Sequence, residues 1–358
     1  MREEFLAEYF KRKKNLILGG CILGIAAVLL AHFGNPPNMA VCAACFIRDI
    51  AGALGLHMTS MVQYMRPEIL GMVIGAAGIA LLTKEFDAKG GSAPVSRFFL
   101  GMIMMIGSLI FLGCPLRMVL RLAGGDYNAI IGLFGFVAGV YTGIVFLRRG
   151  FNLGISKTFP LAVGGVAPGI FIIMALLIPT GIYYQSIQGP GSLAAPVLLS
   201  LGVGIGVGVI CQANRVCTSG AVRDMLLMGN TERMIPIVLF FLLMLIYNIS
   251  SGRFHGGFAG QPIAHTEYAW NFLGLYAVGF AAVLADGCPL RQLMLLGQGS
   301  LNAVMTFMGL LMGAVLMHRL SLAASPLGVP MNGKVVLLCA IAFLFIMAFY
   351  KSHRNLKE

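Results

Sequence analysis

Ten apolar runs, each close to the length of a membrane-crossing helix, constrain the fold more than any other feature of this sequence. Most are about 17 to 20 residues long, enough to cross the hydrocarbon as helices, whereas three are short for that task. With 58% hydrophobic and 11% charged residues, the 358-residue chain has more apolar surface than one soluble core could bury. An all-α integral membrane protein with about ten spans is therefore predicted. The runs lie near 15–34, 67–83, 98–112 (short), 128–147, 160–178, 196–210 (short), 233–249, 270–285 (short), 301–317 and 334–350.

The lysines and arginines are distributed unevenly between the two sides that alternate crossings define. If the N-terminus is cytoplasmic and all ten runs cross, 18 of the 25 fall inside and the other 7 outside. The positive-inside rule favours this orientation, with both termini cytoplasmic and 179–195 and 250–269 outside. Topology thus accounts for the net charge of +12, which does not indicate a nucleic-acid partner. The first run is expected to be a retained helix rather than a signal peptide, in a multi-pass protein of the cell inner (plasma) membrane.

The pentapeptide GCPLR occurs twice, 174 residues apart, and the similarity continues beyond it. Over 113–129 and 287–303, nine of seventeen positions are identical. An upstream pair of motifs, CAACFIRD (42–49) and CTSGAVRD (217–224), shares Cys, Arg and Asp at an offset of 175. Two separate motifs that recur at nearly the same offset predict an internal duplication of the chain.

The two repeat units, about 15–150 and 190–325, contain four spans each, and the single span 160–178 separates them. Because an even number of crossings returns the chain to its starting side, the extra helix makes the second unit begin from the opposite side. The repeats are therefore expected to be inverted, an arrangement typical of transporters whose sites lie at the midplane. The predicted division is a first membrane repeat (1–155), a connecting helix and loop (156–189), a second, inverted repeat (190–325) and a C-terminal helix with its tail (326–358).

The cysteine motifs follow membrane runs directly and are too short to cross, yet too apolar for loops. Such segments indicate re-entrant half-helices, which are tolerated at membrane depth where protein or a watery cavity supplies hydrogen-bond partners. Proline favours the first helical position, so the cysteine of GCPLR is expected at the N-cap, and the preceding glycine permits a sharp entry. Helix N–H groups, the helix dipole and an arginine in the first turn attract an anion. Cys114 with Arg117, and Cys288 with Arg291, are the leading candidate site residues.

The upstream motifs add further candidates to this anion site. Each arginine of these motifs could instead form a structural ion pair with the aspartate that follows it. Two other cysteines, Cys21 and Cys339, have no repeat partner and no polar neighbours in sequence, and are expected to be structural. The six histidines show no metal-ligand spacing, so neither a metal nor another cofactor is expected. The added candidates are Cys42, Cys45, Cys217, Arg48 and Arg223.

The paired GCPLR elements, the upstream cysteine motifs and the duplicated helical body resemble the YeeE/YedE family across nearly the whole chain. Length and the GCPLR wording are more similar to the YedE branch, linked to selenium metabolism, than to the branch that takes up thiosulfate. From that second branch, the resemblance implies an hourglass fold with re-entrant helices from both sides and central cysteines that pass the ion inward through S–H···S contacts. Cys114 and Cys288 match the family's motif best, and the upstream family cysteine is either Cys42 or Cys45. The doubled cysteine of CAAC departs from the pattern.

Two functions follow from these features. The favoured one is a transporter, not an enzyme, for a small sulfur- or selenium-containing anion, with the lipid bilayer as its surroundings and a cytoplasmic sulfur-carrier protein as a candidate partner. The alternative is a membrane thiol-disulfide oxidoreductase that uses Cys42 and Cys45. Such an enzyme would want a second dithiol or a quinone pocket. The matching region has Thr218, Ser219 and Gly220 where a second CxxC would need its cysteine, which favours transport.

Overall fold

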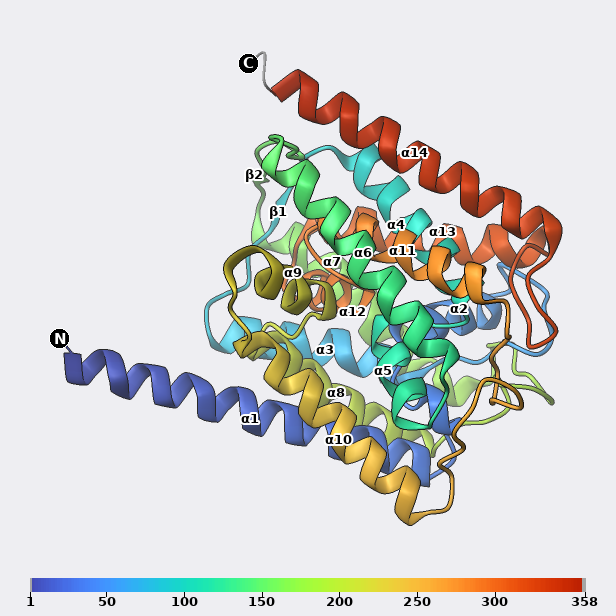
Figure 1. Cartoon of the computed structure of the whole chain (residues 1–358). Helices are drawn as coiled ribbons and strands as arrows, with labels where there is room; N and C mark the ends of the chain where they lie inside the picture. Colours follow the sequence, from blue (N-terminus) through green and yellow to red (C-terminus); the bar gives the residue numbers. More distant parts are fainter. Residues whose placement is uncertain (1, 356–358) are drawn as a thin grey trace.

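Long apolar helices make up most of the structure, a computed structural model that describes residues 2–355 (Figure 1). Within that part of the chain, nine helical segments are long and apolar enough to cross a membrane, and α3 (Pro67–Leu82) is a shorter apolar helix. The only paired strands among the described residues are β1 (Lys89–Gly90) and β2 (Lys157–Thr158), which are antiparallel. The expectation of an all-α integral membrane protein is confirmed.

The helices follow the predicted order, with a short helix after the first and third span of each half. The first half contains α1 (Arg2–His32), η1 (Pro37–Met39), α2 (Ala43–Ala53), α3, α4 (Pro94–Phe111), α5 (Pro115–Ala123) and α6 (Asn128–Arg148). Next come α7 (Leu161–Leu176) and η2 (Ile178–Thr180). The rest is α8 (Val197–Ala213), α9 (Thr218–Met228), η3 (Glu232–Met234), α10 (Ile235–Ser250), α11 (Tyr268–Leu284), α12 (Pro289–Gly297), α13 (Leu301–Arg319) and α14 (Met331–Asn355).

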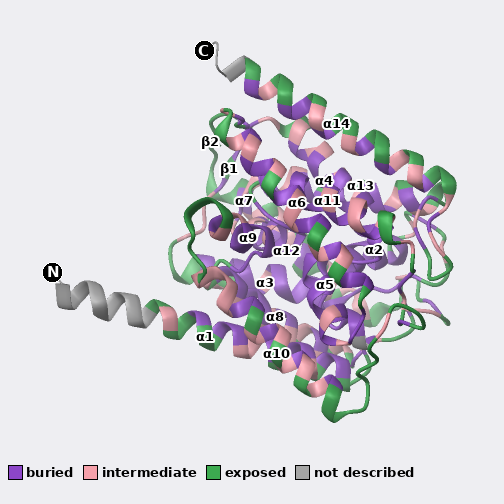
Figure 2. Ribbon diagram, in the orientation of Figure 1, coloured by how far each residue is buried: buried purple, intermediate pink, exposed green. Residues whose placement is uncertain are grey.

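Four short helices, α2, α5, α9 and α12, lie among the spans instead of crossing beside them. They have 11, 9, 11 and 9 residues. At about 1.5 Å per residue this covers roughly half of a hydrocarbon core of about 30 Å. Helix α2 packs against α12, and α5 against α9. Figure 2 shows α2, α5 and α12 mostly purple, with green patches along α1, α10 and α14, so the short helices form part of the interior.

Helix contacts between the two halves come in matched pairs. Helix α3 packs on α8 as α10 packs on α1, and α6 packs on α11 as α13 packs on α4. The match extends to single residues 174 positions apart: a Cβ on Gly135 would overlap the carbonyl of Phe272, and one on Gly309 that of Phe98. Only glycine allows the backbones to approach so closely at these crossings. Helix α7, which packs against α3 and α12, lies between the two halves in sequence.

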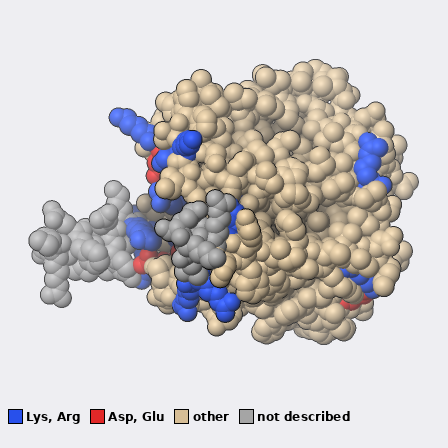
Figure 3. All heavy atoms as spheres, turned by 90° about the horizontal axis from the view of Figure 1, so that it is seen from above, with Lys and Arg blue, Asp and Glu red and all other residues tan. Residues whose placement is uncertain are grey.

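Both described chain ends lie at the same end of the helix bundle, where α1 begins and α14 ends (Figure 1). We call this the terminal end. In Figure 3, lysines and arginines gather there, a few lie at the far end, and a broad band without charged residues separates them. A charge-free band between two charged rims is typical of a protein that spans a bilayer.

Candidate functional site

Each of the four short helices begins directly after a cysteine that occupies its N-cap position. These cysteines are Cys42 before α2, Cys114 before α5, Cys217 before α9 and Cys288 before α12. In α5 and α12 a proline follows at the first helical position, as the sequence predicts. In the other two, the cysteine sulfur accepts a backbone N–H from the first turn, at 3.4 Å in α2 and 3.3 Å in α9. The helix ends thus direct free N–H groups at sulfur.

The cysteines meet in two pairs, one in each half. The Sγ atoms of Cys42 and Cys114 are 3.6 Å apart, and those of Cys217 and Cys288 are also 3.6 Å apart. This separation fits a weak S–H···S contact and is far longer than a disulfide bond of about 2.05 Å. All four thiols are free. We call them the first-half and second-half cysteine pairs.

The backbone turns sharply just before each GCPLR motif, whereas the sequence predicts the turn at the glycine of the motif. Leu112 has φ 62° and Asp286 has φ 64°, so the left-handed residue precedes the glycine at both matched positions. The expectation that the glycine itself makes the turn is therefore wrong. Its role is spatial, because a Cβ on Gly113 would overlap the side chain of Arg117. Gly287 is in the same relation to the arginine of its own motif.

Arg117 is fully buried beside the first-half cysteine pair, and its hydrogen bonds go to neutral oxygens and to one sulfur. Its Nε donates to the backbone oxygen of Asn38 at 3.1 Å, and one terminal nitrogen donates to the Asn38 Oδ1 at 3.2 Å and the Ile263 oxygen at 3.3 Å. The other terminal nitrogen is 3.3 Å from the Sγ of Cys45. Arg117 thereby connects α5 to loops from both halves and to α2.

Arg291, the matching arginine of the second half, also bonds to a neutral group. It donates to the Oε1 of Gln212 at 2.9 Å, and Gln212 donates in turn to Gln298 at 3.1 Å. Among the described residues, neither Arg291 nor Arg117 has an acidic side chain within ion-pair distance. Neither guanidinium thus has a carboxylate partner there, and Arg117 is fully buried, which is costly and favours an anion nearby.

The arginine of the first upstream motif has an acidic partner. Asp49 binds Arg48 at 2.6 Å with one carboxylate oxygen and Arg66 at 2.7 Å with the other, and all three side chains are buried. The sequence leaves open whether Arg48 belongs to the anion site or forms a structural ion pair. In the structure it forms the ion pair. Arg66 also donates to the backbone oxygens of Leu193 and Pro190, which ties this cluster to the second half.

The second upstream motif repeats the arrangement closer to solvent. Asp224 binds Arg223 at 3.1 Å and Arg233 at 2.9 Å, and these two arginine side chains are 28% and 32% exposed. Helix α9 is thus held by an aspartate with two arginines, as α2 is. Here, however, both arginine side chains are partly exposed and line a cavity.

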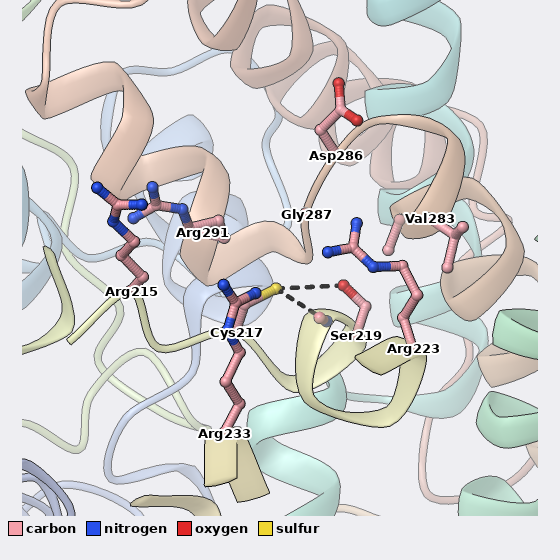
Figure 4. Close-up of a pocket in the computed structure, with 11 residues that line it drawn as sticks. Arg215, Cys217, Ser219, Arg223, Arg233, Val283, Asp286, Gly287 and Arg291 are labelled. Atoms are coloured by element: carbon pink, nitrogen blue, oxygen red, sulfur yellow. Dashed lines mark hydrogen bonds between the residues drawn. The ribbon is translucent and has the colours of Figure 1, made fainter. Parts of the chain in front are cut away.

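A cavity of about 190 Å³ opens beside the second-half cysteine pair, at the terminal end (Figure 4). Figure 4 shows four arginines around the sulfur of Cys217, which contacts the hydroxyl of Ser219 at 3.2 Å. In the first-half pair Cys42 is 0% and Cys114 1% exposed, whereas in the second-half pair Cys217 is 7% exposed and Cys288 is 1% exposed. The arginines that line the cavity are Arg215, Arg223, Arg233 and Arg291.

Residues 213–351 match the model of a family described as sulphur transport. Over this segment the chain is similar to the sulphur transport family. The match covers about two fifths of the chain and includes the second-half cysteine pair and every residue that lines the basic cavity, Arg291 among them. It confirms the resemblance to the YeeE/YedE family that the motifs carry. No curated protein matches the chain.

Several polar residues around the site, inside and outside the sulphur transport segment, are not predicted from the sequence. Arg66 and Arg233 complete the two aspartate clusters but do not recur at the repeat offset. Asn38 and Gln212 bind the two GCPLR arginines from loop 33–42 and from the end of α8. Asn38 and Gln212 share one weak signal, since each is a polar residue four or five positions before an upstream cysteine motif.

Proposed function

We propose that this protein carries a small anion containing sulfur or selenium across the membrane, past the two cysteine pairs. The observation that carries the proposal is the state of Arg117 and Arg291. Each lies in the first turn of a short helix that a cysteine caps, without a carboxylate partner among the described residues. Such a charge, next to free N–H groups, favours an anion as its missing partner. The sulphur transport match over the second half supports the same conclusion.

The residue types suit an anion of the thiosulfate kind or a selenium species. The oxygen atoms of such an ion can accept hydrogen bonds from a guanidinium and from helix N–H groups. Its terminal sulfur or selenium is soft and polarizable, and thiols at 3.6 Å spacing offer weak S–H contacts of matching character. No covalent bond needs to form or break, so passage requires free thiols and no turnover chemistry.

We further propose that the halves are inverted repeats with boundaries at 1–155, 156–189, 190–325 and 326–358. The helix contacts are matched between the halves, and the contact of Gly135 with Phe272 is repeated by that of Gly309 with Phe98. Both observations support a two-fold relation. By the positive-inside rule the terminal end faces the cytoplasm of the inner membrane. The first-half pair then receives the anion from outside, and the basic cavity releases it inward. A cytoplasmic sulfur-carrier protein is the proposed recipient there, because four arginines surround the exit.

The alternative, a thiol-disulfide oxidoreductase that uses Cys42 and Cys45, has less support. The sulfur of Cys42 contacts Cys114, and that of Cys45 faces Arg117. Although the Cys42 and Cys45 thiols also interact with each other, each has a further partner, Cys114 and Arg117 respectively. In the second half, Gly220 stands at the position that would need the matching cysteine.

Uptake into vesicles tests the transport proposal. Protein reconstituted in lipid vesicles is expected to take up labelled thiosulfate or selenite in preference to sulfate. Serine at Cys114 or Cys288 should abolish uptake with expression unchanged, because the hydroxyl lacks the soft, polarizable sulfur. Serine at Cys21 or Cys339, which lie outside both pairs, serves as the matched control and should be near neutral. Equal loss in all four variants would indicate a folding defect and would count against a cysteine path.

A further inference from the structure

The two halves differ at several positions next to their matched cysteines, and one of these differences adds or removes an ionisable group. With the offset of 175 that relates Cys42 to Cys217, residue Cys45 corresponds to Gly220. In the first half, the Cys45 sulfur is 3.3 Å from a terminal nitrogen of Arg117. In the second half, the glycine has no side chain to place there and lines the 190 Å³ cavity, together with Arg291. The half with the extra cysteine is sealed, and the half with the glycine is open.

The charge balance around Arg117 gives Cys45 a specific role. Both residues are fully buried. Burying a guanidinium without a counter-charge costs free energy, because the group loses its water. A buried neighbour must then offset this desolvation cost. Of the groups that hydrogen-bond Arg117 in the described part of the chain, namely Asn38, Ile263 and Cys45, only the thiol can ionise to a negative charge.

We propose that Cys45 is an internal ligand of Arg117: in the substrate-free protein its thiolate occupies the position that the transported anion takes at the first-half site. The inference rests on the proposed function, in which Arg117 binds that anion. An entering ion must displace the thiolate before it can reach the guanidinium. Only an ion that pairs with Arg117 better than a thiolate does can enter, so Cys45 acts as a selectivity filter against weakly binding anions.

The second half lacks this filter, which suits a release site. Gly220 leaves the guanidinium of Arg291 and the sulfur of Cys217 facing open space. An anion that reaches this site meets no competing thiolate and departs into the cavity. The exchange of cysteine for glycine at this position thus contributes to one end of the path being selective and closed, and the other permissive and open.

Reciprocal substitutions test this role. Cys45→Gly removes the internal ligand, and Cys45→Ser keeps its size without an ionisable thiol. Both variants should lower the external thiosulfate concentration for half-maximal uptake by at least about tenfold. This factor corresponds to the smallest free energy typical of a hydrogen bond with a charged partner. Both should also become sensitive to inhibition by excess sulfate. Gly220→Cys should slow release and leave half-saturation unchanged; a Cβ there would lie 3.3 Å from the Cβ of Cys217, so that neighbour must shift by a few tenths of an ångström.

The results separate this inference from the proposed function. Wild-type uptake together with abolished uptake in both Cys45 variants would show that the thiol belongs to the conducting path, and would overturn the internal-ligand role while transport stands. Unchanged half-saturation in both variants would overturn it equally. If the folded wild-type protein takes up none of the three anions, the transport proposal fails. The thiolate is then checked directly: an ultraviolet thiolate absorbance lost in Cys45→Ser supports the internal ligand, and identical spectra refute it.

Discussion

Replacing Asp49 with asparagine should destabilise the protein far more than the same change at Asp224, although the two aspartates occupy matched positions. Among the described residues, Asp49→Asn removes the only carboxylate bonded to Arg48 and Arg66, whose side chains are 4% and 0% exposed. Breaking a buried ion pair by removing one partner costs about 3 to 5 kcal/mol, because the other charge stays buried and unpaired. Here two guanidinium groups lose their partner together, so the upper end of that range is expected.

The arginines bound to Asp224 are 28% and 32% exposed, so water screens them when the carboxylate is lost. A solvent-screened pair contributes about 0 to 1 kcal/mol, and Asp224→Asn should cost no more than that. Midpoints of thermal unfolding, measured for both variants and wild type in one detergent, report the difference. Asp49→Glu, which keeps the charge, should recover part of the loss. Equal shifts for the two asparagine variants, or a larger shift for Asp224→Asn, would refute the assignment of the first cluster as a buried structural anchor.

Three further predictions concern the path and its direction. Arg117→Ala should raise the external concentration for half-maximal uptake, and Arg291→Ala should mainly slow release. Lysine at either position should have a smaller effect because it keeps the charge. Normal uptake kinetics in both alanine variants would show that the arginines are structural. A charged alkylating reagent applied from the terminal end should label Cys217, which is 7% exposed, faster than Cys114 at 1%, and equal rates would contradict a sealed first half. Reporter fusions should place both chain ends in the cytoplasm, and ends on opposite sides would contradict the proposed inverted repeat.

Much of the site could be predicted because the duplication repeats its chemistry at a fixed offset. The spacing of GCPLR and of the upstream motifs picks out four cysteines that all become N-caps of short helices. Proline at the first helical position is a local rule, so it fixes where α5 and α12 begin without any knowledge of the fold. The ten apolar runs likewise predict the spans, since length and hydropathy decide membrane crossing.

The missing parts depend on contacts that no local rule describes. Arg66 and Arg233 reach the matched aspartates from different distances along the chain, so the repeat offset does not reveal them. The contact between Cys45 and Arg117 joins residues 72 positions apart. The left-handed conformations of Leu112 and Asp286 have no sequence signal either, because non-glycine residues rarely adopt a positive φ.

Those two left-handed residues bear on how the protein is made. Segments Pro94–Ala123 and Tyr268–Gly297 are each 30 residues long and apolar enough to enter the bilayer as one uninterrupted helix. Local preference does not favour the break, since a left-handed conformation costs a non-glycine residue roughly 1 to 2 kcal/mol. Tertiary partners must stabilise it, and α5 packs against η1 and α6 of the first half and against α9 and α10 of the second. Because two of these four partners are synthesised late, we expect α4 and α5 to reach their final bent arrangement only after synthesis has passed Ser250.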